Sequence, residues 1–437
     1  MKSPELLSPA GTLQHMRAAF AYGADAAYAG LPRYGLRVRE NEFDLATLEL
    51  AINEAHQQQK KLYITANILA HNSKVKTFEK DIESVIELKP DALIMADPGL
   101  IMLVRERWPE QTVHLSVQAN TVNYATVRFW QQLGIERIIL SRELSLEEVE
   151  EIRQQCPEME LEVFVHGALC MAYSGRCLLS GYINHRDANQ GSCTNACRWE
   201  YHEVASEEDD NGDLKRAIAA EPIKPAEPQR ILIEEMGRPG EAMPIEEDEN
   251  GTYIMNSRDL RAVEHIQRLV EIGIDSLKIE GRTKSIYYVS RVSQSYRRAI
   301  DDAVAGRGFD TALLAELENL ASRGYTDGFF KRHHSEEYQN YIQGNSQGHR
   351  QIYVAEIIDY DPTKKLATLV AKNKFGTGDR LELILPSGNR EITLDKIYGK
   401  KEQPMAVVPG GGYQVKAEID LTPEQGEYQF GMIARFL

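Results

Sequence analysis

The stretch PELLSPAGTLQHMRAAFAYGADAAYAG, from Pro4 to Gly30, contains the repeating unit that predicts the fold. Its first part, PELLSPAG, is an apolar run typical of a strand, and its last part, DAAYAG, is a second such run. Between them the apolar residues recur at helical spacing and share one face: Leu13, Met16, Ala19 and Phe20. A strand, a helix and a strand in this order indicate two parallel strands joined by a helical crossover.

The same alternation continues along the chain. Six further apolar runs follow: LYITANI, DALIMAD, TVHLSVQAN, ERIILSRE, LEVFV and SLKIEGR. These runs are nearly continuous in apolar residues, as parallel strands covered on both faces require. Eight such strands with helical crossovers predict an α/β fold, a (β/α)8 TIM-like barrel. A doubly wound open sheet is the alternative, but no G-x-G-x-x-G follows the first strand, and TYIMN at Thr252–Asn256 is a ninth candidate strand.

Two segments extend this barrel. About 110 residues separate the seventh strand from the eighth, far more than an ordinary connection contains. Residues 166–199 are rich in cysteine, and the acidic residues 203–250 predict a solvated, partly flexible insertion. We therefore expect a catalytic barrel domain over residues 1–340 with a long insertion after its seventh strand. Short alternating strands over residues 350–437, separated by turns such as PSGN and PGGGY, predict a small C-terminal antiparallel β-barrel domain. Its lysines could dock RNA, but lysines on exposed turns are more often ordinary solubility residues.

Charge and composition limit the choice of partners. The net charge is −16, but 15 acidic and 5 basic residues between Glu203 and Asn250 account for −10 of it. The acidity is therefore local, and charge neither supports nor excludes an RNA partner. The N-terminus lacks the apolar segment of a secretory signal, and no run of about 18 apolar residues occurs, so we expect a cytoplasmic protein that does not cross a membrane.

Polar residues stand at the ends of six predicted strands. Barrel enzymes place their catalytic groups at the carboxyl ends of the strands. We therefore take five of these residues as catalytic candidates: His166, Glu143, Gln118, Asn67 and Glu280. The sixth, Asp97, precedes a proline, where it equally serves as a helix cap. The alternative for all six is that such residues simply begin loops.

Basic residues near the same strand ends predict anion binding. The candidates for substrate binding are Arg33, Arg37, Arg142, Arg282 and Lys284. Arg282 and Lys284 follow the eighth strand, where barrels often hold a phosphate. The helix pattern that comes next, TKSIYYVSRVSQSYRRAI, alternates tyrosine and arginine, which can contact RNA. Packing of its aromatic face on the barrel is the favoured interpretation.

Four of the five cysteines lie within 28 positions: Cys170, Cys177, Cys193 and Cys197. Their spacing, C-x6-C-x15-C-x3-C, lacks the paired C-x2-C knuckles of zinc ribbons, and the cytosolic setting disfavours disulfides. The spacing favours a 4Fe–4S cluster, with zinc as the alternative metal. His166 stands just before this set and could orient a substrate, move a proton or hydrogen-bond a sulfur. Cys156 is expected to be a bystander.

The run EVFVHGALCMAYSGRCLLSGY, from Glu162 to Tyr182, resembles the signature of the collagenase-like peptidase family of unassigned catalytic type. The resemblance extends to PELLSPAGT, PRYGLRVRENEF, CTNACRWEY and RGYTDGFF, and so covers essentially the whole chain. Its closest likeness is to members that hydroxylate tRNA. The resemblance implies a 4Fe–4S cluster on the four cysteines, prephenate as a required metabolite, and oxygen-independent conversion of the wobble uridine of tRNA to 5-hydroxyuridine.

Three functions remain open from the sequence. The first is this tRNA hydroxylation, with an electron donor still to be identified and with the arginines holding prephenate through its carboxylates. The second is proteolysis, which the family name suggests. Against it, the chain has no H-E-x-x-H motif, and no base is evidently paired with Ser174 or Ser180. The third is a cluster-bearing adaptor that delivers tRNA or electrons to another enzyme.

Overall fold

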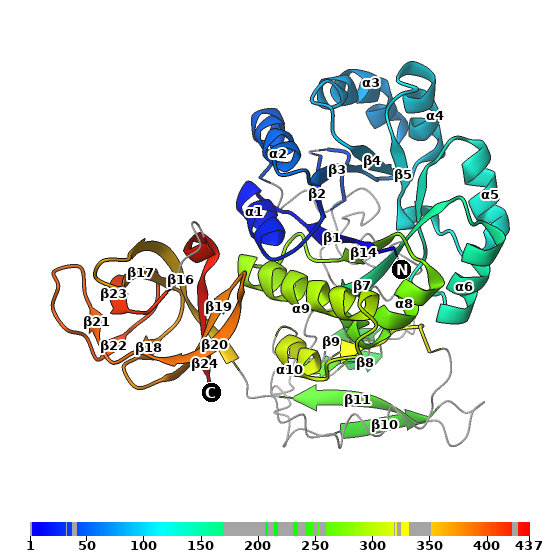
Figure 1. Ribbon diagram of the computed structural model, residues 1–437. Helices are drawn as coiled ribbons and strands as arrows, with labels where there is room; N and C mark the ends of the chain where they lie inside the picture. The colour runs from blue at the N-terminus through cyan, green and yellow to red at the C-terminus, as the bar shows by residue number, and fades with distance from the viewer. Residues whose placement is uncertain are drawn as a thin grey trace.

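The computed structural model comprises a barrel, an insertion and a C-terminal β-domain (Figure 1). It describes the backbone and side chains of residues 2–31, 33–36, 42–169, 259–318, 320, 325–331, 351–421 and 428–437. It also describes the backbone of residue 427 and of five short strands between residues 206 and 253. Statements below refer to these residues.

Eight parallel strands form a closed barrel. In order around the ring they are β14 (Ser276–Ile279), β1 (Glu5–Pro9), β2 (Ala26–Gly30), β3 (Lys61–Ala66), β4 (Ala92–Met95), β5 (Val113–Leu115), β6 (Arg137–Ile139) and β7 (Glu160–Ala168). The pairing of β14 with both β1 and β7 closes the ring. The predicted (β/α)8 barrel is thereby confirmed, and the open doubly wound sheet is excluded.

A ring of helices surrounds the strands, as Figure 1 shows. The helices are α1 (Leu13–Ala21), α2 (Leu45–Gln57), α3 (Asn72–Ile86), α4 (Pro98–Arg107), α5 (Tyr124–Gln132), α6 (Leu146–Gln155), α8 (Ile266–Ile272) and α9 (Ile286–Val304), and α10 (Ala312–Glu318) follows α9. Side chains placed directly before several helices cap them. Asp97, for example, accepts hydrogen bonds from the backbone of Gly99 and Leu100 at the start of α4. Asp97 is therefore a helix cap, the alternative that its position before Pro98 suggested.

The main core lies between the strands and the helices. Alternate strand residues that point toward the helices are fully buried, among them Leu6, Leu62, Leu93, Leu115 and Leu277. The helices contribute buried side chains of the same kind, such as Met16, Leu48 and Phe78. Each fully buried side chain of this size stabilises the fold by about 1.5–3 kcal/mol, so this layer holds the barrel together.

Two short strands extend the barrel sheet beside β7. Strand β13 (Asp259–Arg261) pairs antiparallel with β7, and β15 (Tyr325–Thr326) pairs parallel with β13. Of the ninth candidate strand at Thr252–Asn256, the structure describes only Thr252 and Tyr253, and these two residues do not belong to this sheet. Instead, β12 (Gly251–Tyr253) joins β11 (Ala242–Asp248) and β10 (Arg230–Glu234) in a separate antiparallel sheet, and β8 (Ser206–Glu208) pairs with β9 (Leu214–Arg216).

The C-terminal domain is an antiparallel β-domain, as the alternating pattern predicted. Its seven-stranded sheet has the order β20 (Gly388–Thr393), β19 (Arg380–Leu385), β24 (Met432–Phe436), β16 (Gln351–Asp361), β17 (Leu366–Ala371), β23 (Gln414–Glu418) and β21 (Ile397–Tyr398). A two-stranded sheet of β18 (Phe375–Gly376) and β22 (Val407–Val408) completes it, and the short helix η7 (Glu427–Phe430) precedes β24.

This domain packs against α1 and α9 of the barrel. The hydroxyl of Tyr22, the residue that follows α1, donates to the carbonyls of Ile384 at 3.1 Å and Phe430 at 2.8 Å. Arg291 on α9 forms an ion pair with Glu382 at 3.3 Å. Of the tyrosines of α9, Tyr288 and Tyr296 are buried in the barrel core, as the favoured interpretation expected, and Tyr287 stacks on Tyr353 of the C-terminal domain at 4.8 Å. The two domains therefore share a specific interface.

Candidate functional site

The carboxyl ends of the barrel strands bring four of the predicted site residues together. Asn67 follows β3, Arg142 follows β6, and Glu280 and Arg282 follow β14. In barrels of this kind the loops at this edge bind the substrate. We call these four residues the mouth cluster.

Arg142 joins β6 to the ends of β7 and β14. Its guanidinium donates to the carbonyl of Ala168 at 3.0 Å and pairs with the Glu280 carboxylate at 3.3 Å. The same group lies 3.8 Å from the centre of the Phe164 ring. Its side chain is only 11% exposed, so these contacts orient it firmly at the edge of the barrel.

Arg282 and Asn67 are linked through the backbone of Leu36. Arg282 donates to the Leu36 carbonyl and, at 3.1 Å, to the Thr65 hydroxyl. The Asn67 amide oxygen accepts from the Leu36 N–H at 3.1 Å, and its nitrogen donates to the Ser116 hydroxyl at 3.2 Å. Strands β3, β5 and β14 and the loop after β2 thus share one network of hydrogen bonds.

Gln118 and Glu143 lie on the loops at the same edge. Gln118 belongs to the short helix η2 (Val117–Ala119) that follows β5 and is buried. Glu143 directly follows Arg142 and is partly buried. Their catalytic roles stay predictions.

His166 points away from the mouth cluster. The register between β7 and β14 shifts just before it, so that His166 aligns with Ile279 on the side of the strands that faces the helices. The ring is 1% exposed, and its nitrogens lie 3.2 Å from the Tyr296 hydroxyl and 3.4 Å from the Tyr325 hydroxyl. Burial lowers the pKa of His166 to about 3, so the ring is neutral at physiological pH. Its catalytic role stays a prediction.

Gly167 is required for the close approach of β7 to β14. Its φ is 103°, a conformation that other residues rarely adopt. A side-chain carbon added there would lie 2.4 Å from the carbonyl oxygen of Glu280. The His166-Gly167 pair therefore allows β7 and β14 to pair closely at this point.

Two predicted anion-binding residues have partners outside the mouth cluster. Arg33 is exposed and forms an ion pair with Asp81 on α3 at 2.8 Å. Lys284 lies 3.7 Å from the Asp259 carboxylate on β13 and 5.3 Å from the centre of the Tyr288 ring. These contacts of Arg33 and Lys284 are therefore with residues other than those of the mouth cluster.

Five predicted site residues lie outside the described residues: Arg37, Cys170, Cys177, Cys193 and Cys197. The description reaches Leu169, the residue just before the first of these cysteines, at the carboxyl end of β7. Cys156 is buried at the end of α6, and its thiol donates to the Tyr124 carbonyl at 3.6 Å.

A layer of charged residues fills the barrel beneath the mouth cluster. Glu162, which is fully buried, accepts from Lys278 at 2.8 Å and pairs with Arg137 at 3.3 Å, and Arg137 also pairs with Glu5. Burial lowers the pKa of Lys278, and the Glu162 carboxylate opposes that shift. Burial raises the pKa of Glu5, but Arg137 and the Tyr63 hydroxyl lower it by more. The sequence signal for this layer is a charged residue in four otherwise largely apolar strands, β1, β6, β7 and β14.

Three polar residues on the loops after β5 and β6 have buried atoms without hydrogen-bond partners. These are both amide atoms of Asn120 and the hydroxyls of Thr121 and Ser141. The two loops meet where the Ser141 N–H donates to the Thr121 carbonyl at 3.1 Å. Buried polar atoms of this kind call for a water or a ligand. They mark this side of the barrel edge as a further part of the candidate site.

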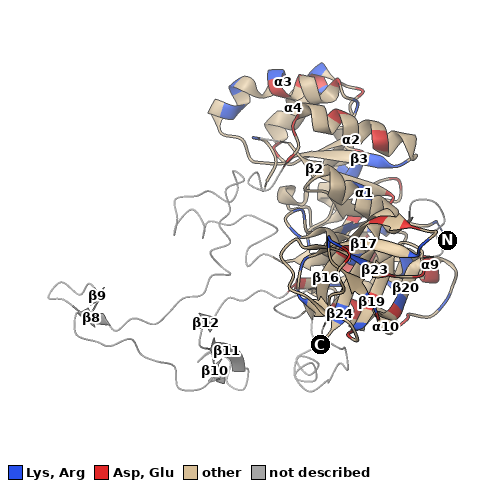
Figure 2. Cartoon of the chain, turned by 90° about the vertical axis from the view of Figure 1, so that its left-hand side faces the viewer, with Lys and Arg blue, Asp and Glu red and all other residues tan. Residues whose placement is uncertain are grey.

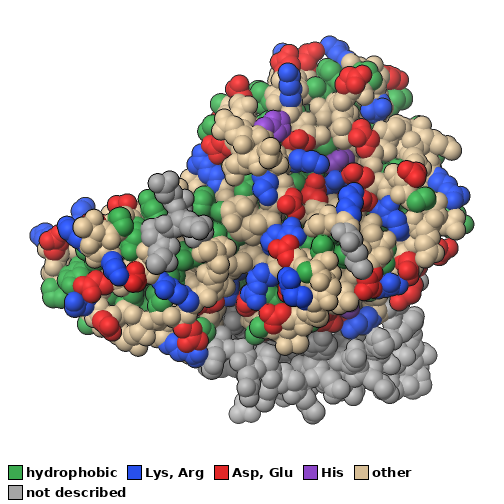
Figure 3. Space-filling view, viewed as in Figure 1, with side chains coloured by type: hydrophobic (Ala, Val, Ile, Leu, Met, Phe, Trp, Pro, Cys, Tyr) green, Lys and Arg blue, Asp and Glu red, His purple; other side chains and the backbone are tan. Residues whose placement is uncertain are grey.

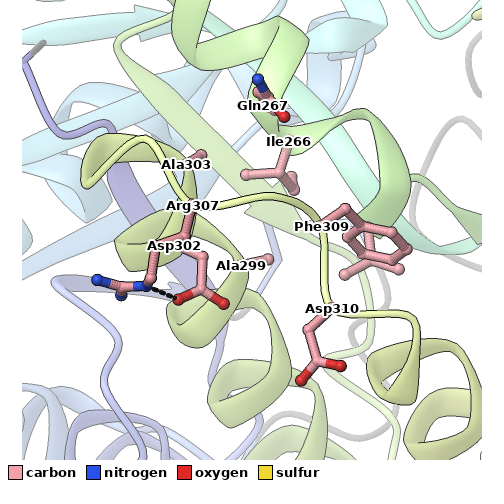
Figure 4. Close-up of a pocket in the computed structure, with 9 residues that line it drawn as sticks. Ile266, Gln267, Ala299, Asp302, Ala303, Arg307, Phe309 and Asp310 are labelled. Atoms are coloured by element: carbon pink, nitrogen blue, oxygen red, sulfur yellow. Dashed lines mark hydrogen bonds and ion pairs between the residues drawn. The ribbon is translucent and has the colours of Figure 1, made fainter.

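Two cavities lie outside the barrel edge. The first, between α8, α9 and the loop after α9, has a volume of about 10 Å³, enough for one water (Figure 4). Asp302 and Arg307 pair at its border at 2.6 Å. The second measures about 400 Å³ and lies between α1, α9 and the C-terminal domain, with Gln14, Ser290 and Glu356 among its lining residues.

Among the helices in the described part of the chain, none is both long and apolar enough to cross a membrane. Figure 2 shows basic and acidic positions mixed along the described ribbon, and on the face seen in Figure 3 side chains of both signs are interspersed. The face seen in Figure 3 therefore presents no large region of one charge.

Comparison with known proteins identifies the family. The model of Peptidase family U32 matches residues 11–340, and that of the Peptidase family U32 C-terminal domain matches residues 349–429. The tRNA hydroxylation protein P of Escherichia coli (strain K12) is 57% identical over 444 residues, covering 100% of this chain and 97% of that protein. The tRNA hydroxylation protein P of Haemophilus influenzae is 53% identical and covers 99% and 96%.

Among solved structures, the U32 peptidase Mk0906 is 15% identical, with a TM-score of 0.39, and the match covers 64% of this chain and 95% of that one. The resemblance expected from the run at Glu162–Tyr182 is confirmed by the two family models and by both relatives. This chain belongs to peptidase family U32.

Proposed function

We propose that this protein hydroxylates the wobble uridine of tRNA to 5-hydroxyuridine, without molecular oxygen, and with prephenate and a 4Fe–4S cluster as requirements. The observation that carries the proposal is the 57% identity, over the whole chain, to a protein named for tRNA hydroxylation. The barrel edge supports it, because its charged and polar residues suit a small anionic metabolite. The reaction takes place in the cytoplasm, where tRNA is available.

Arg142 and Arg282 are the proposed ligands of the prephenate carboxylates. They follow different strands, β6 and β14, and both lie above aromatic rings, Phe164 at 3.8 Å and Tyr28 at 6.0 Å from the guanidinium carbons. A guanidinium can bind a carboxylate through two parallel hydrogen bonds. Two such groups, each beside an aromatic ring, fit a compact ring that carries two carboxylates.

Glu280 and Asn67 are the proposed groups for proton transfer and orientation. Glu280 is 17% exposed and its carboxylate already contacts Arg142, so the substrate carboxylate and Glu280 would share that guanidinium. Asn67 is held by the Leu36 N–H and the Ser116 hydroxyl and offers a fixed amide at the same edge. These contacts position both side chains before any substrate arrives.

The four cysteines are the proposed ligands of the cluster. Their thiolates are the donor set that 4Fe–4S clusters use, although the same set also accepts zinc. The described chain fits this placement, because Ala168, two residues before Cys170, accepts a hydrogen bond from Arg142 of the mouth cluster. When bound, such a cluster supplies one-electron transfer, and the donor of those electrons is a required partner.

Peptidase activity is the weaker candidate. The sequence GNSQG at Gly344–Gly348 matches the G-x-S-x-G pattern of a serine nucleophile, but it lies outside the described residues and precedes the C-terminal β-domain. The helix required after such a serine is absent from the described residues that follow it, which begin with strand β16. Among the described residues, His166 contacts tyrosines and not a serine or cysteine.

Complementation of a deletion strain tests the proposal. Bulk tRNA from cells carrying wild-type protein, Cys193→Ala or Cys156→Ala is digested to nucleosides and analysed by mass spectrometry. We expect 5-hydroxyuridine with the wild type and with Cys156→Ala, the matched control, and none with Cys193→Ala. Normal 5-hydroxyuridine with Cys193→Ala would refute the role of the cluster.

A further inference from the structure

A histidine and two carboxylates meet beside β13 and β15. Glu264 and His265 belong to the short helix η6 (Val263–His265), which follows β13, and Asp327 directly follows β15. The parallel pairing of β13 with β15 brings them together, since Asp259 aligns with Tyr325 and the two strands continue in the same direction. One ligand atom from each of the three lies within 4.8 Å of the other two.

The His265 ring is buried and aimed at both carboxylates. The residue is 7% exposed, and its Nε2 atom lies 3.6 Å from Glu264 Oε1 and 3.6 Å from Asp327 Oδ2. Both distances exceed that of a hydrogen bond, and in the described structure this nitrogen has no hydrogen-bond partner. A buried ring nitrogen between two carboxylates, but bonded to neither, indicates that something belongs between them.

The separations suit a shared metal ion. Ligand atoms that each lie about 2.1 Å from one ion are roughly 3.0–3.4 Å apart. The two separations from His265 Nε2, both 3.6 Å, are close to that range, and all three ligand atoms lie within 4.8 Å of one another, so side-chain adjustment would close the site. A cation already occupies this position: Lys331 Nζ lies 3.2 Å from Glu264 Oε1 and 3.6 Å from Asp327 Oδ2. The Lys331 side chain is 34% exposed and can leave into solvent.

We propose that Glu264, His265 and Asp327 bind a divalent cation, which replaces the ammonium group of Lys331. One imidazole and two carboxylates suit Mn²⁺, Fe²⁺ or Zn²⁺. The ion would fasten the segment after β15 to η6. It would also steady the start of α6, because the Phe330 carbonyl accepts from the Leu146 N–H at 3.3 Å. This proposal uses none of the four cysteines and does not depend on the proposed hydroxylation.

Titration of the purified full-length protein with Mn²⁺ tests the site. The protein is first treated with a chelator to remove bound metal. Binding is then measured as loss of the electron paramagnetic resonance signal of free Mn²⁺. Mn²⁺ is the chosen probe because it prefers oxygen and nitrogen ligands, whereas thiolates select softer metals. We expect one Mn²⁺ per chain. His265→Gln and Asp327→Asn should weaken binding by at least about tenfold. Lys331→Met should strengthen it roughly threefold to tenfold, because the competing ammonium is gone.

Controls keep the outcome decisive. Asp302→Asn, which removes a carboxylate paired with Arg307 outside the cluster, should leave binding unchanged. Mn²⁺ should also raise the thermal midpoint of the wild type but not that of Asp327→Asn. Lys331→Met removes only a partly exposed cation, so this variant should fold even if the ligand variants do not. Absence of saturable Mn²⁺ binding by Lys331→Met would therefore overturn the proposal. Equal binding by the wild type and His265→Gln would overturn it as well.

Discussion

Replacing Glu162 by glutamine should destabilise the barrel strongly. Glu162 is fully buried and contacts two buried cations, Lys278 at 2.8 Å and Arg137 at 3.3 Å. The substitution keeps the shape of the side chain but leaves those cations without their shared carboxylate. Removing one partner of a buried ion pair costs about 3–5 kcal/mol, because the remaining charge cannot be solvated. At an unfolding entropy of about 2.1 cal/mol/K per residue, a domain of this size should lose roughly 4–10 °C in its thermal midpoint.

Two further variants isolate the cause. Glu160→Gln removes a carboxylate that is 46% exposed and pairs with the same Arg137 at 2.8 Å, so its cost should stay below about 1 kcal/mol. Glu162→Gln combined with Lys278→Met removes both members of a buried pair and should recover most of the loss. Thermal and urea unfolding followed by circular dichroism measure all three. If Glu162→Gln costs no more than Glu160→Gln, the buried layer does not stabilise the barrel as argued.

Three other changes have expected outcomes. Burial lowers the pKa of His166 from 6.5 in the unfolded chain to about 3 in the folded chain. The contribution of the neutral ring to the free energy of unfolding is therefore complete above pH 6.5 and declines by up to about 1.4 kcal/mol per pH unit down to pH 3. When the free energy of unfolding is measured against pH, His166→Phe should remove this part of the pH dependence. Gly167→Ala forces a side chain against Glu280 and should cost at least about 2 kcal/mol in urea unfolding; a cost below about 0.5 kcal/mol would contradict the geometry. Arg142→Lys should raise the prephenate concentration for half-maximal tRNA hydroxylation by about tenfold, whereas Arg33→Lys should not change it; equal effects would remove Arg142 from the proposed site.

The sequence predicted the barrel because its strands are apolar runs separated by helical patterns. It did not predict β13 and β15, which contain three residues and two residues. Strands this short have no periodicity of their own. β13 forms because it pairs with the last residues of β7, and β15 forms because it pairs with β13. The expected strand at Thr252–Asn256 shows the same limit, because local composition cannot say which sheet a strand joins.

The candidate site was predicted in part for a similar reason. Asn67, Arg142, Glu280 and Arg282 were found from their places at strand ends, which the barrel then gathers on one edge. The direction of His166 depends on a register shift between β7 and β14, a tertiary feature that the sequence does not encode locally. The pairing of Arg33 with Asp81, which is 48 positions away, likewise depends on how α3 packs.

Anaerobic reconstitution tests the central claim most directly. Purified protein is combined with unmodified tRNA and prephenate, in one series with a chemical reductant and in a parallel series with a one-electron acceptor, because gain of an oxygen atom at the uridine ring removes two electrons from it. The nucleosides are then analysed by mass spectrometry. We predict that the wobble uridine gains one oxygen atom only when prephenate and the iron-loaded protein are both present. The protein used must contain about four iron and four sulfide ions per chain by chemical analysis. If the tRNA stays unmodified with such protein, the claim is contradicted and this chain is left with the role of an adaptor.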